Sequence, residues 1–408
     1  MPTRKQIAIA VRLLAIACLA FPVFFLLFAS YTTFHSVRTF YLYGTEQAAV
    51  SPHGHGSHDV LLVSALFPLA KSKHSMDDYR SWMARFLGTV KTDIYFFTPP
   101  EMEPLIAELR GDLPITINTT FSSPYDIPPL SGLKDYYEEM HKIDRENSYH
   151  SPELYAVWNG KAYYLEEGMK NSKKTYKYVF WTDAGGFRGD HVYEWWPDYQ
   201  RLEELWNEGS KTTNVQKHDL FFIPTTQAPG SGKKHWTEDK GPVDIDFSEG
   251  SFFGGQPEAV RWWRRTFYAY HDYYRSMNMF VGKDQTVFNA IILLYSHRMI
   301  TVWLDDPQAP ARKGLVRGVD GSTLGRCGSE WYYYEFFLAD AFTRQQMREI
   351  WNAEAKSTSE WWKNRQTCRL TRLLAMKELL SRQFGPKWIP PDATVLNSLG
   401  DGPLIRSS

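Results

Sequence analysis

Three apolar runs early in the chain alternate with two segments of helical spacing, and this alternation restricts the fold more than any other feature. Continuous apolar runs indicate strands that are buried on both faces. Strand, helix, strand, helix, strand at these spacings is typical of a parallel, Rossmann-like sheet. The predicted strands are 58–69, 91–100 and 114–121, and the predicted helices between them are 75–88 and 101–111.

The rest of the chain predicts further strands and helices and then becomes largely helical. We therefore expect an α/β domain over residues 58–342 and a helical C-terminal extension over 343–408. The further strands are predicted at 176–181, 217–226, 244–255 and 299–306, and the further helices at 151–171, 256–277 and 283–298.

An uncharged apolar run, 13–29, lies close to the N-terminus. Its length is near the lower limit of about 17–25 residues for a membrane-spanning helix. Basic residues precede it, and positive charge on that side predicts that the N-terminus stays cytosolic and the rest enters the lumen. We expect an uncleaved signal anchor of type II topology in the Golgi or ER; a cleaved signal peptide is the alternative. The expected segments are a cytosolic tail (1–12), the anchor (13–31) and a stem (32–57).

The composition narrows the possible partners. Lys+Arg and Asp+Glu are both 46, so the chain has no net charge and no basic excess suited to nucleic acid. In an oxidising lumen, Cys327 and Cys368 form one disulfide or remain two buried thiols. Asn118 begins an N-x-[ST] sequon and is a candidate for N-glycosylation. Three stem histidines, His53, His55 and His58, fit a solvated linker better than a metal site, because nothing nearby fixes their geometry.

Several common catalytic motifs are absent from the sequence. The first strand is not followed by G-x-G-x-x-G, which argues against a dehydrogenase. There is no G-x-x-x-x-G-K-[ST], G-x-S-x-G or H-E-x-x-H either. Kinase-like, serine-hydrolase and zincin functions are therefore excluded.

The segment "WTDAGG" places Asp183 directly after an apolar strand. Ligands of open α/β sheets bind beyond the carboxyl ends of strands, where this residue falls. A carboxylate there can hold a hard divalent cation, and the small residues that follow leave room for a diphosphate. An ordinary turn aspartate is the alternative interpretation.

Two later segments have comparable positions. "FSEGSFFGG" ends in Gly254 and Gly255, which let a ligand approach the backbone, although tight strand–helix packing explains two glycines nearly as well. "GKDQTVFN" opens a helix with Asp284 and Gln285, and a helix N-terminus favours anions and hydroxyl contacts. Taken alone, Asp284 is an ordinary N-cap.

In this order, the three segments resemble the layout of GT-A glycosyltransferases. The chain is similar to the blood-group-type galactosyl- and N-acetylgalactosaminyltransferases, and more closely to the HtrL/YibB-type family of glycosyltransferases. The motifs that carry this resemblance are "VSALF" (63–67), "WNGK" (158–161) and "WTDAG" (181–185), and it covers roughly residues 59–300.

The resemblance implies a GT-A-like, mixed but mainly parallel sheet, and a nucleotide-sugar donor bound through Mn²⁺ or Mg²⁺. Asp183 is the expected metal ligand, and Asp284 and Gln285 are the expected catalytic residues. One departure is Gly185, which stands where a full D-x-D has its second acid; Asp305, Asp306 or His297 are weaker candidates for the second ligand. The expected donor-binding residues are Ala65, Phe67, Lys161, Asp183, Gly185, Phe253, Gly254 and Gly255.

We therefore expect a glycosyltransferase of the hexosyltransferase type that moves a sugar from a nucleoside diphosphate donor, a UDP-sugar, to a glycan or glycoconjugate. The alternative is a catalytically inactive lectin or scaffold protein with the same fold, because the D-x-D is incomplete. A metal-dependent hydrolase is a third possibility, weakened by the lack of a dense His/Asp cluster outside the stem. Lys161 can neutralise a phosphate, although an exposed helical lysine is the common alternative.

Overall fold

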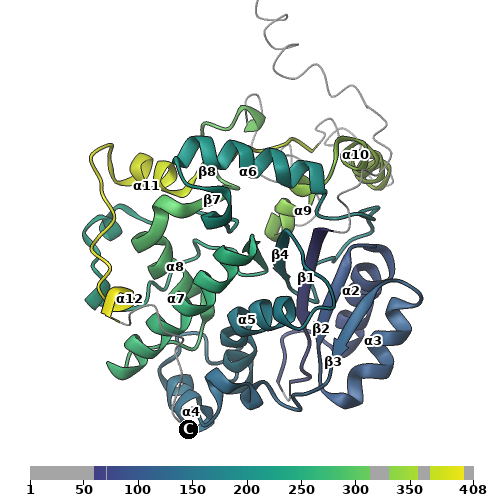
Figure 1. Cartoon of the computed structure of the whole chain (residues 1–408), viewed down its shortest axis with the longest axis horizontal. Helices are drawn as coiled ribbons and strands as arrows, with labels where there is room; N and C mark the ends of the chain where they lie inside the picture. The colour runs from purple at the N-terminus through teal and green to yellow at the C-terminus, as the bar shows by residue number, and fades with distance from the viewer. Residues whose placement is uncertain (1–58, 70, 313–329, 357–367, 399–408) are drawn as a thin grey trace, which may run out of the picture. The chain divides into compact units, whose positions relative to one another are not determined.

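The computed structural model describes residues 59–69, 71–312, 330–356 and 368–398 (Figure 1). All of them belong to one compact unit, 53–408. The predicted cytosolic tail, anchor and stem lie outside the described residues, so the expected topology stays a prediction. Within the described ranges, no helix combines the length and the apolar character that crossing a membrane requires.

The described residues form an eight-stranded mixed sheet in the order β3-β2-β1-β4-β6-β5-β7-β8. Neighbours are parallel at β1–β2, β2–β3, β1–β4 and β5–β7, and antiparallel on both sides of β6 and at β7–β8. This confirms the predicted α/β class with a mainly parallel sheet. The strands are β1 (Val60–Ala65), β2 (Asp93–Phe97), β3 (Ile115–Asn118), β4 (Tyr178–Thr182), β5 (Phe221–Phe222), β6 (Phe252–Gly255), β7 (Met299–Val302) and β8 (Leu373–Ala375).

Helices cover both faces of the sheet. In Figure 1, α6 lies above β4 and β7, and α5 and α7 lie below them. The described helices are α2 (Met76–Thr89), α3 (Glu103–Arg110), α4 (Lys134–Ile143), α5 (Pro152–Lys170), α6 (Tyr199–Thr213), α7 (Pro257–Ser276), α8 (Asp284–Tyr295), α9 (Tyr333–Leu338), α10 (Ala341–Lys356), α11 (Met376–Phe384) and α12 (Val395–Ser398).

The apolar runs of the central strands supply two cores because their side chains alternate between the two faces. In β1, Leu61 and Val63 belong to the core that contains α5, α7 and α8. Val60 and Leu62 belong to the opposite core, with residues of α2, α3 and α6. Burial on both faces is the reason for the unbroken apolar sequence, as predicted.

N-capping residues mark the starts of several helices. Ser75 caps α2 as predicted and forms a capping box with Asp78, whose carboxylate accepts the Ser75 backbone N–H. Ser151 caps α5 without a capping box, and its hydroxyl oxygen accepts the backbone N–H of Leu154.

Some expected strands are much shorter in the structure. The run 217–226 contributes only the two residues of β5, and 244–255 contributes only β6. Lys217–Asp219 forms a short 3-10 helix. Much of the remainder of both runs is irregular and is held by backbone hydrogen bonds, such as those from Ile223 to Ile300 and from Thr226 to Phe247, as well as by side chains. The sequence did not predict α4, α6 or β8.

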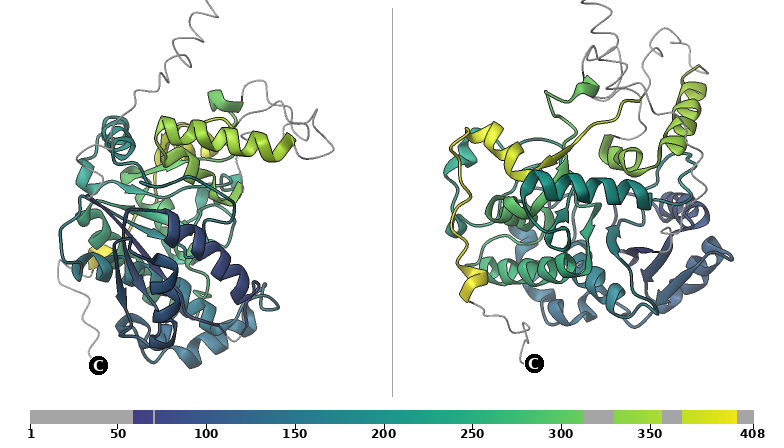
Figure 2. Two further views of the ribbon diagram at one scale, coloured as in Figure 1. Left: turned by 90° about the vertical axis from the view of Figure 1, so that its right-hand side faces the viewer. Right: turned by 45° about the horizontal axis from the view of Figure 1, so that its top comes forward.

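The C-terminal segment belongs to the same sheet as the rest of the described chain. β8 pairs antiparallel with β7, so the expected helical extension contributes an edge strand. In the right-hand view of Figure 2, the yellow segment passes through α11 and then runs down the outer side of the described unit to α12, which packs near α7. Cys368 precedes β8 and is disulfide-bonded; the other two cysteines, Cys18 and Cys327, lie outside the described residues.

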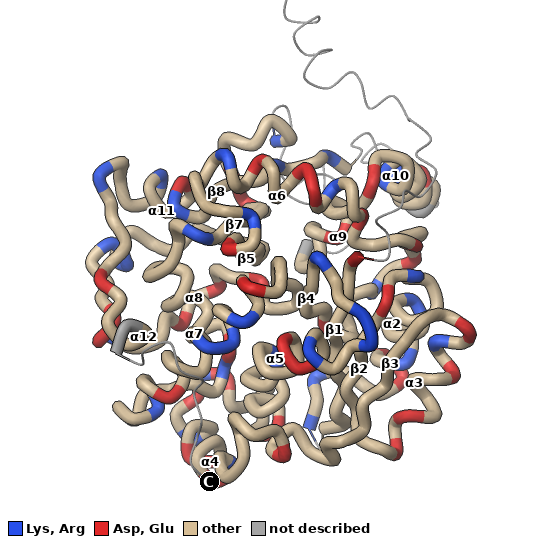
Figure 3. The backbone as a smooth tube through the Cα atoms, viewed as in Figure 1, with Lys and Arg blue, Asp and Glu red and all other residues tan. Residues whose placement is uncertain are grey.

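Acidic and basic residues are scattered over the described backbone, with both signs present on most sides (Figure 3). This pattern agrees with the balanced totals of the sequence. The surface charge therefore does not indicate a functional site, and a cluster of charges inside the molecule is the better indicator of one.

Candidate functional site

A cavity of about 300 Å³ opens at the carboxyl ends of β1 and β4. The chain leaves β1 toward β2 and β3 on one side, and returns through α5 to β4 on the other side. Such a topological switch point is where open α/β sheets bind ligands. The cavity is lined by Ala65–Leu69, Ser72, His74, Met76, Tyr79, Leu154, Val157, Trp158, Lys161, Trp181, Asp183–Gly185, Arg188 and Tyr332.

Five of the predicted donor-binding residues meet in this cavity: Ala65, Phe67, Lys161, Asp183 and Gly185. They come from three separate elements, the exits of β1 and β4 and the middle of α5. The structure thus brings these five residues together, while their role in binding a donor stays a prediction.

Lys161 is the centre of a buried ionic cluster. Its Nζ lies 3.1 Å from Asp183 Oδ1 and 3.5 Å from Asp284 Oδ2, and donates to the carbonyl oxygen of Gly250 at 2.9 Å. The residue is 4% exposed, so the alternative of an exposed helical lysine is wrong. Lys161 joins α5 to the end of β4, the start of α8 and the loop before β6.

The two aspartates differ in their access to the cavity. Asp183 has a side chain that is 33% exposed, and its Oδ1 also accepts the indole N–H of Trp181 at 2.6 Å. Asp284 is 2% exposed and does not line the cavity, because Lys161 lies between them. Its Oδ1 accepts the backbone N–H of Gln285, whereas Oδ2 has no hydrogen-bond partner besides the ion pair with Lys161.

The buried charges shift one another's protonation. Burial raises the pKa of Asp284, and the nearby ammonium of Lys161 opposes that shift. Burial by itself lowers the pKa of Lys161, but Asp183 and Asp284 outweigh it and raise the pKa above its usual value. Lys161 therefore remains charged, and its positive charge is compensated within the cluster.

Glu249 is a buried acid next to this cluster that the sequence did not single out. It is 8% exposed, and its Oε1 accepts the backbone N–H of Ser251 at 3.3 Å. Burial, together with the nearby carboxylate of Asp183, raises the pKa of Glu249 to about 7. Near neutral pH, this carboxyl group is divided between its protonated and ionised forms.

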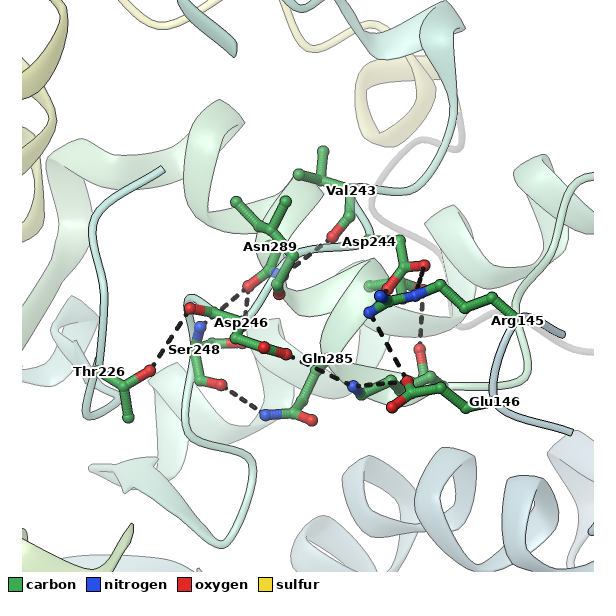
Figure 4. Close-up of polar contacts among 12 residues, drawn as sticks. Arg145, Glu146, Thr226, Val243, Asp244, Asp246, Ser248, Gln285 and Asn289 are labelled. Atoms are coloured by element: carbon green, nitrogen blue, oxygen red, sulfur yellow. Dashed lines mark hydrogen bonds and ion pairs between the residues drawn. The ribbon is translucent and has the colours of Figure 1, made fainter. Parts of the chain in front are cut away.

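The loop before Glu249 is held by side chains of α8 (Figure 4). Gln285 Nε2 donates to the Ser248 carbonyl oxygen at 2.5 Å. Asn289 donates to the carbonyl oxygens of Val243 and Ile245, and its Oδ1 accepts from the backbone N–H and the hydroxyl of Ser248. Gln285, expected to be catalytic, lies outside the cavity lining and is used to position this loop.

The "FFGG" segment lies in the sheet and not in the cavity. Phe253 is fully buried, with its ring 6.4 Å from that of Trp181. A Cβ at Gly254 would lie 2.2 Å from the Val179 carbonyl oxygen, and one at Gly255 would lie 2.7 Å from that of Leu220. Close strand packing accounts for both glycines, and none of the three residues lines the expected donor space.

The glycines after Asp183 are also explained in part by packing. A Cβ at Gly185 would lie 3.1 Å from the Trp82 ring of α2. Gly186 donates its N–H to the Asp183 carbonyl oxygen at 3.0 Å, which closes a tight turn. The turn and the cavity therefore coexist at this strand end.

The other candidate metal ligands lie elsewhere. Asp306 is fully buried and pairs with Arg372 and Arg382, while Asp305 lies 3.7 Å from Arg312. Neither aspartate lines the cavity, and His297 does not line it either. In the part of the chain that the structure describes, no group of three or more His, Cys, Asp or Glu side chains is arranged to hold a metal ion.

Asp183 still offers one open oxygen to a cation. Oδ1 accepts from Trp181 and pairs with Lys161, but no described residue donates to Oδ2. Mg²⁺ is commonly bound by one or two carboxylates together with substrate phosphates. The donor set fits a cation whose shell a diphosphate completes, and does not fit a cation held by protein groups alone.

The sequon residue Asn118 ends β3, the edge strand of the sheet. Its Nδ2 donates to the Tyr95 hydroxyl at 3.0 Å, and its Oδ1 accepts the Thr120 backbone N–H. The residue is half-buried. Glycosylation at this position stays a prediction.

Two charged residues near Asp183 escaped the sequence analysis although their signals were present. Arg188 directly follows "DAGGF", and Glu249 lies within "FSEGSFFGG". Arg188 comes six residues after the end of β4, and Glu249 three residues before the start of β6. A charge this close to an apolar strand is a usable signal for the rim or floor of a switch-point cavity.

Comparison with known proteins adds little to this geometry. Models of protein families give no match, and neither do curated proteins. Among solved structures, the apo form of mouse xyloside xylosyltransferase 1 matches at 11% identity and a TM-score of 0.31, covering 59% of this chain and 83% of that one. A likeness this low carries no argument, so the function has to rest on the cavity's own residues.

Proposed function

We propose that this protein is a glycosyltransferase that transfers a sugar from a nucleoside diphosphate-sugar, a UDP-sugar, to a glycan or glycoconjugate acceptor. The observation that carries the proposal is the cavity at the β1–β4 switch point, which combines the open carboxylate of Asp183, two cations and aromatic walls. Polar groups that converge in an aromatic-rich cavity are characteristic of ligand sites. The resemblance to the GT-A layout and to the HtrL/YibB-type family supports the same proposal.

The residues have different roles in this account. Aromatic side chains such as Trp158 and Phe67 provide flat surfaces for a base or a sugar ring. Lys161 fixes the orientation of Asp183 at 3.1 Å. Asp284 is sealed behind Lys161, so we assign it to positioning that lysine and not to deprotonating an acceptor, which it cannot reach.

A divalent cation, Mn²⁺ or Mg²⁺, is part of the proposal. Held by Asp183 Oδ2 together with the diphosphate, it would neutralise charge that develops on the leaving group. We further propose that the protein works in the Golgi or ER lumen, anchored by residues 13–31, because of the charge pattern around that apolar run.

An inactive, binding-only protein is the second candidate, and one observation favours it. Asp183 is the single carboxylate among the described residues that line the cavity. If it holds a cation, the described lining contains no other carboxylate to activate an acceptor. Such a protein would bind a nucleotide-sugar without turning it over.

Both candidates can be tested on the full-length chain, purified in mild detergent. It is mixed with a panel of nucleoside diphosphate-sugars, with and without Mn²⁺, and the melting temperature and the release of nucleoside diphosphate to acceptor glycans are measured. Transfer requires that one donor raises the melting temperature and is consumed. Stabilisation without consumption supports the binding-only protein, and no stabilisation by any donor rejects both candidates.

A further inference from the structure

The cavity contains a second cation whose surroundings differ from those of Lys161. An ammonium group has three N–H donors. Those of Lys161 face Asp183, Asp284 and the Gly250 carbonyl oxygen. A phosphate could bind Lys161 only by displacing one of these partners, so this lysine is a poor phosphate ligand in spite of its charge.

Arg188 lines the same cavity and is exposed. Its guanidinium carbon lies 4.3 Å from the centre of the Trp82 ring and 5.2 Å from that of Tyr332. The Nε–H donates to the Gly185 carbonyl oxygen at 3.1 Å. Two aromatic contacts and one hydrogen bond fix the plane of the guanidinium before any ligand arrives.

The outer edge of this guanidinium is open. Among the described residues, none accepts a hydrogen bond from its two NH₂ groups, and no carboxylate lies within ion-pair distance of them. The nearby Glu335 does not compensate Arg188, because burial raises the pKa of its carboxyl group well above the usual value. Asp78 feels the charge of Arg188, which helps to lower its pKa, but it forms no ion pair with the guanidinium. Arg188 therefore combines a fixed orientation, a charge without an ion-pair partner among the described residues, and unused donors.

We propose that Arg188 is the phosphate-binding residue of the cavity and grips the diphosphate of the ligand through its two NH₂ groups. A planar guanidinium matches two oxygens of a phosphate in a bidentate contact. This inference rests on the proposed function only in that the ligand carries a nucleoside. Binding of the diphosphate itself can be tested with a probe that has no nucleoside.

Isothermal titration calorimetry of the full-length chain in EDTA separates binding of the diphosphate from binding of the nucleoside. The probes are UDP, uridine and inorganic pyrophosphate. Wild type is expected to bind UDP more tightly than uridine, and to bind pyrophosphate. Arg188→Gln should weaken UDP and pyrophosphate binding by about 10- to 100-fold and leave uridine unchanged. Arg188→Lys should recover only part of the loss, because an ammonium lacks the fork.

Arg80→Gln is the matched control. Arg80 lies on α2, is exposed, and pairs with Glu108 away from the cavity. This variant should bind all three probes as wild type does. If Arg188→Gln, folded by its circular dichroism, binds UDP within twofold of wild type, or if wild type binds neither UDP nor pyrophosphate, the assignment is rejected. Binding of pyrophosphate through Arg188 without binding of any nucleotide-sugar would retain it and reject the proposed function instead.

Discussion

At the scale of single residues, Lys161 lines the cavity, and the buried Asp284 behind it is its counter-ion. Lys161→Met removes the ammonium and leaves Asp284 buried without a counter-ion. Breaking such a pair from one side costs about 3–5 kcal/mol. We expect a loss of this order in the free energy of unfolding, measured by chemical denaturation.

The double variant Lys161→Met/Asp284→Asn distinguishes an uncompensated charge from lost packing. It removes both charges, so it should be clearly more stable than Lys161→Met alone. Equal stability of the single and double variants would mean that the ion pair is not what holds these elements together.

Glu249 makes the folding free energy depend on pH. Its pKa is about 7 in the folded chain, against 4.5 for an unperturbed glutamate. Because the folded pKa is the higher one, the stabilising contribution is complete below pH 4.5 and is lost as the pH rises through about 7. At about 1.4 kcal/mol per pH unit, the loss is on the order of 3 kcal/mol.

Glu249→Gln should abolish this dependence. The melting temperature of the variant minus that of wild type is expected to be larger at pH 8 than at pH 5, because only wild type has to bury an ionised carboxylate at pH 8. Melting curves of both proteins at the two pH values test this, and a difference that does not change with pH would contradict the raised pKa.

At the scale of elements, the antiparallel contact of β6 with β4 depends on Gly254. Its missing side chain allows β4 to approach to a distance where a Cβ would lie 2.2 Å from the Val179 carbonyl oxygen. Gly254→Ala should lower the free energy of unfolding by about 3 kcal/mol or more, because backbone atoms have to move.

Gly189→Ala is the control for that substitution. A Cβ at Gly189 would meet nothing within 4 Å, so the change should stay within about 0.5 kcal/mol. If Gly254→Ala is as stable as Gly189→Ala, the close approach of the strands is not a constraint on this position.

Much of the element pattern was predictable because burial on both faces produces long apolar runs. β1, β2, β3 and β4 and the helices α2, α3, α5, α7 and α8 follow such runs or clear helical spacing. The run 217–226 was predicted as one strand, but only the two residues of β5 pair with β6 and β7, and no local pattern reveals so short a pairing. α6 was missed although Asp198 is a capping residue directly before an amphipathic segment.

The part of the candidate site that lies at the ends of strands could be predicted from the sequence. Asp183, Ala65 and Phe67 line the cavity because parallel strands end at the same edge of a sheet. The burial of Asp284 behind Lys161 could not be predicted, because it depends on how α5 and α8 pack together. The direction of the Gln285 side chain, toward Ser248, is likewise set by tertiary contacts.

At the scale of the whole described unit, the C-terminal segment is tied to the sheet by a buried ionic contact. Asp306, which is fully buried, lies 2.7 Å from Arg372 and 3.3 Å from Arg382. Asp306→Asn should cost about 2–3 kcal/mol of unfolding free energy, less than for a fully buried pair, because both arginines are partly exposed.

The neighbouring Asp305→Asn provides a matched control, since Asp305 lies on the surface side of the same turn and pairs with Arg312 at 3.7 Å. Its effect should stay below about 1 kcal/mol. Limited proteolysis after β7 should increase in Asp306→Asn only. Equal protection of both variants would contradict the view that Asp306 holds this segment in place.

The central claim, that the β1–β4 cavity binds a nucleoside diphosphate-sugar through Asp183, is tested most directly by one titration. Wild type and Asp183→Asn, both full-length, are titrated calorimetrically with the donor that stabilises wild type most, in the presence of Mn²⁺. The asparagine keeps the shape of the side chain and removes the charge that a hard cation requires. The account predicts that the folded variant loses at least about tenfold in Mn²⁺-dependent affinity. Unchanged Mn²⁺-dependent binding by folded Asp183→Asn would contradict the claim and leave Asp183 an ordinary turn residue.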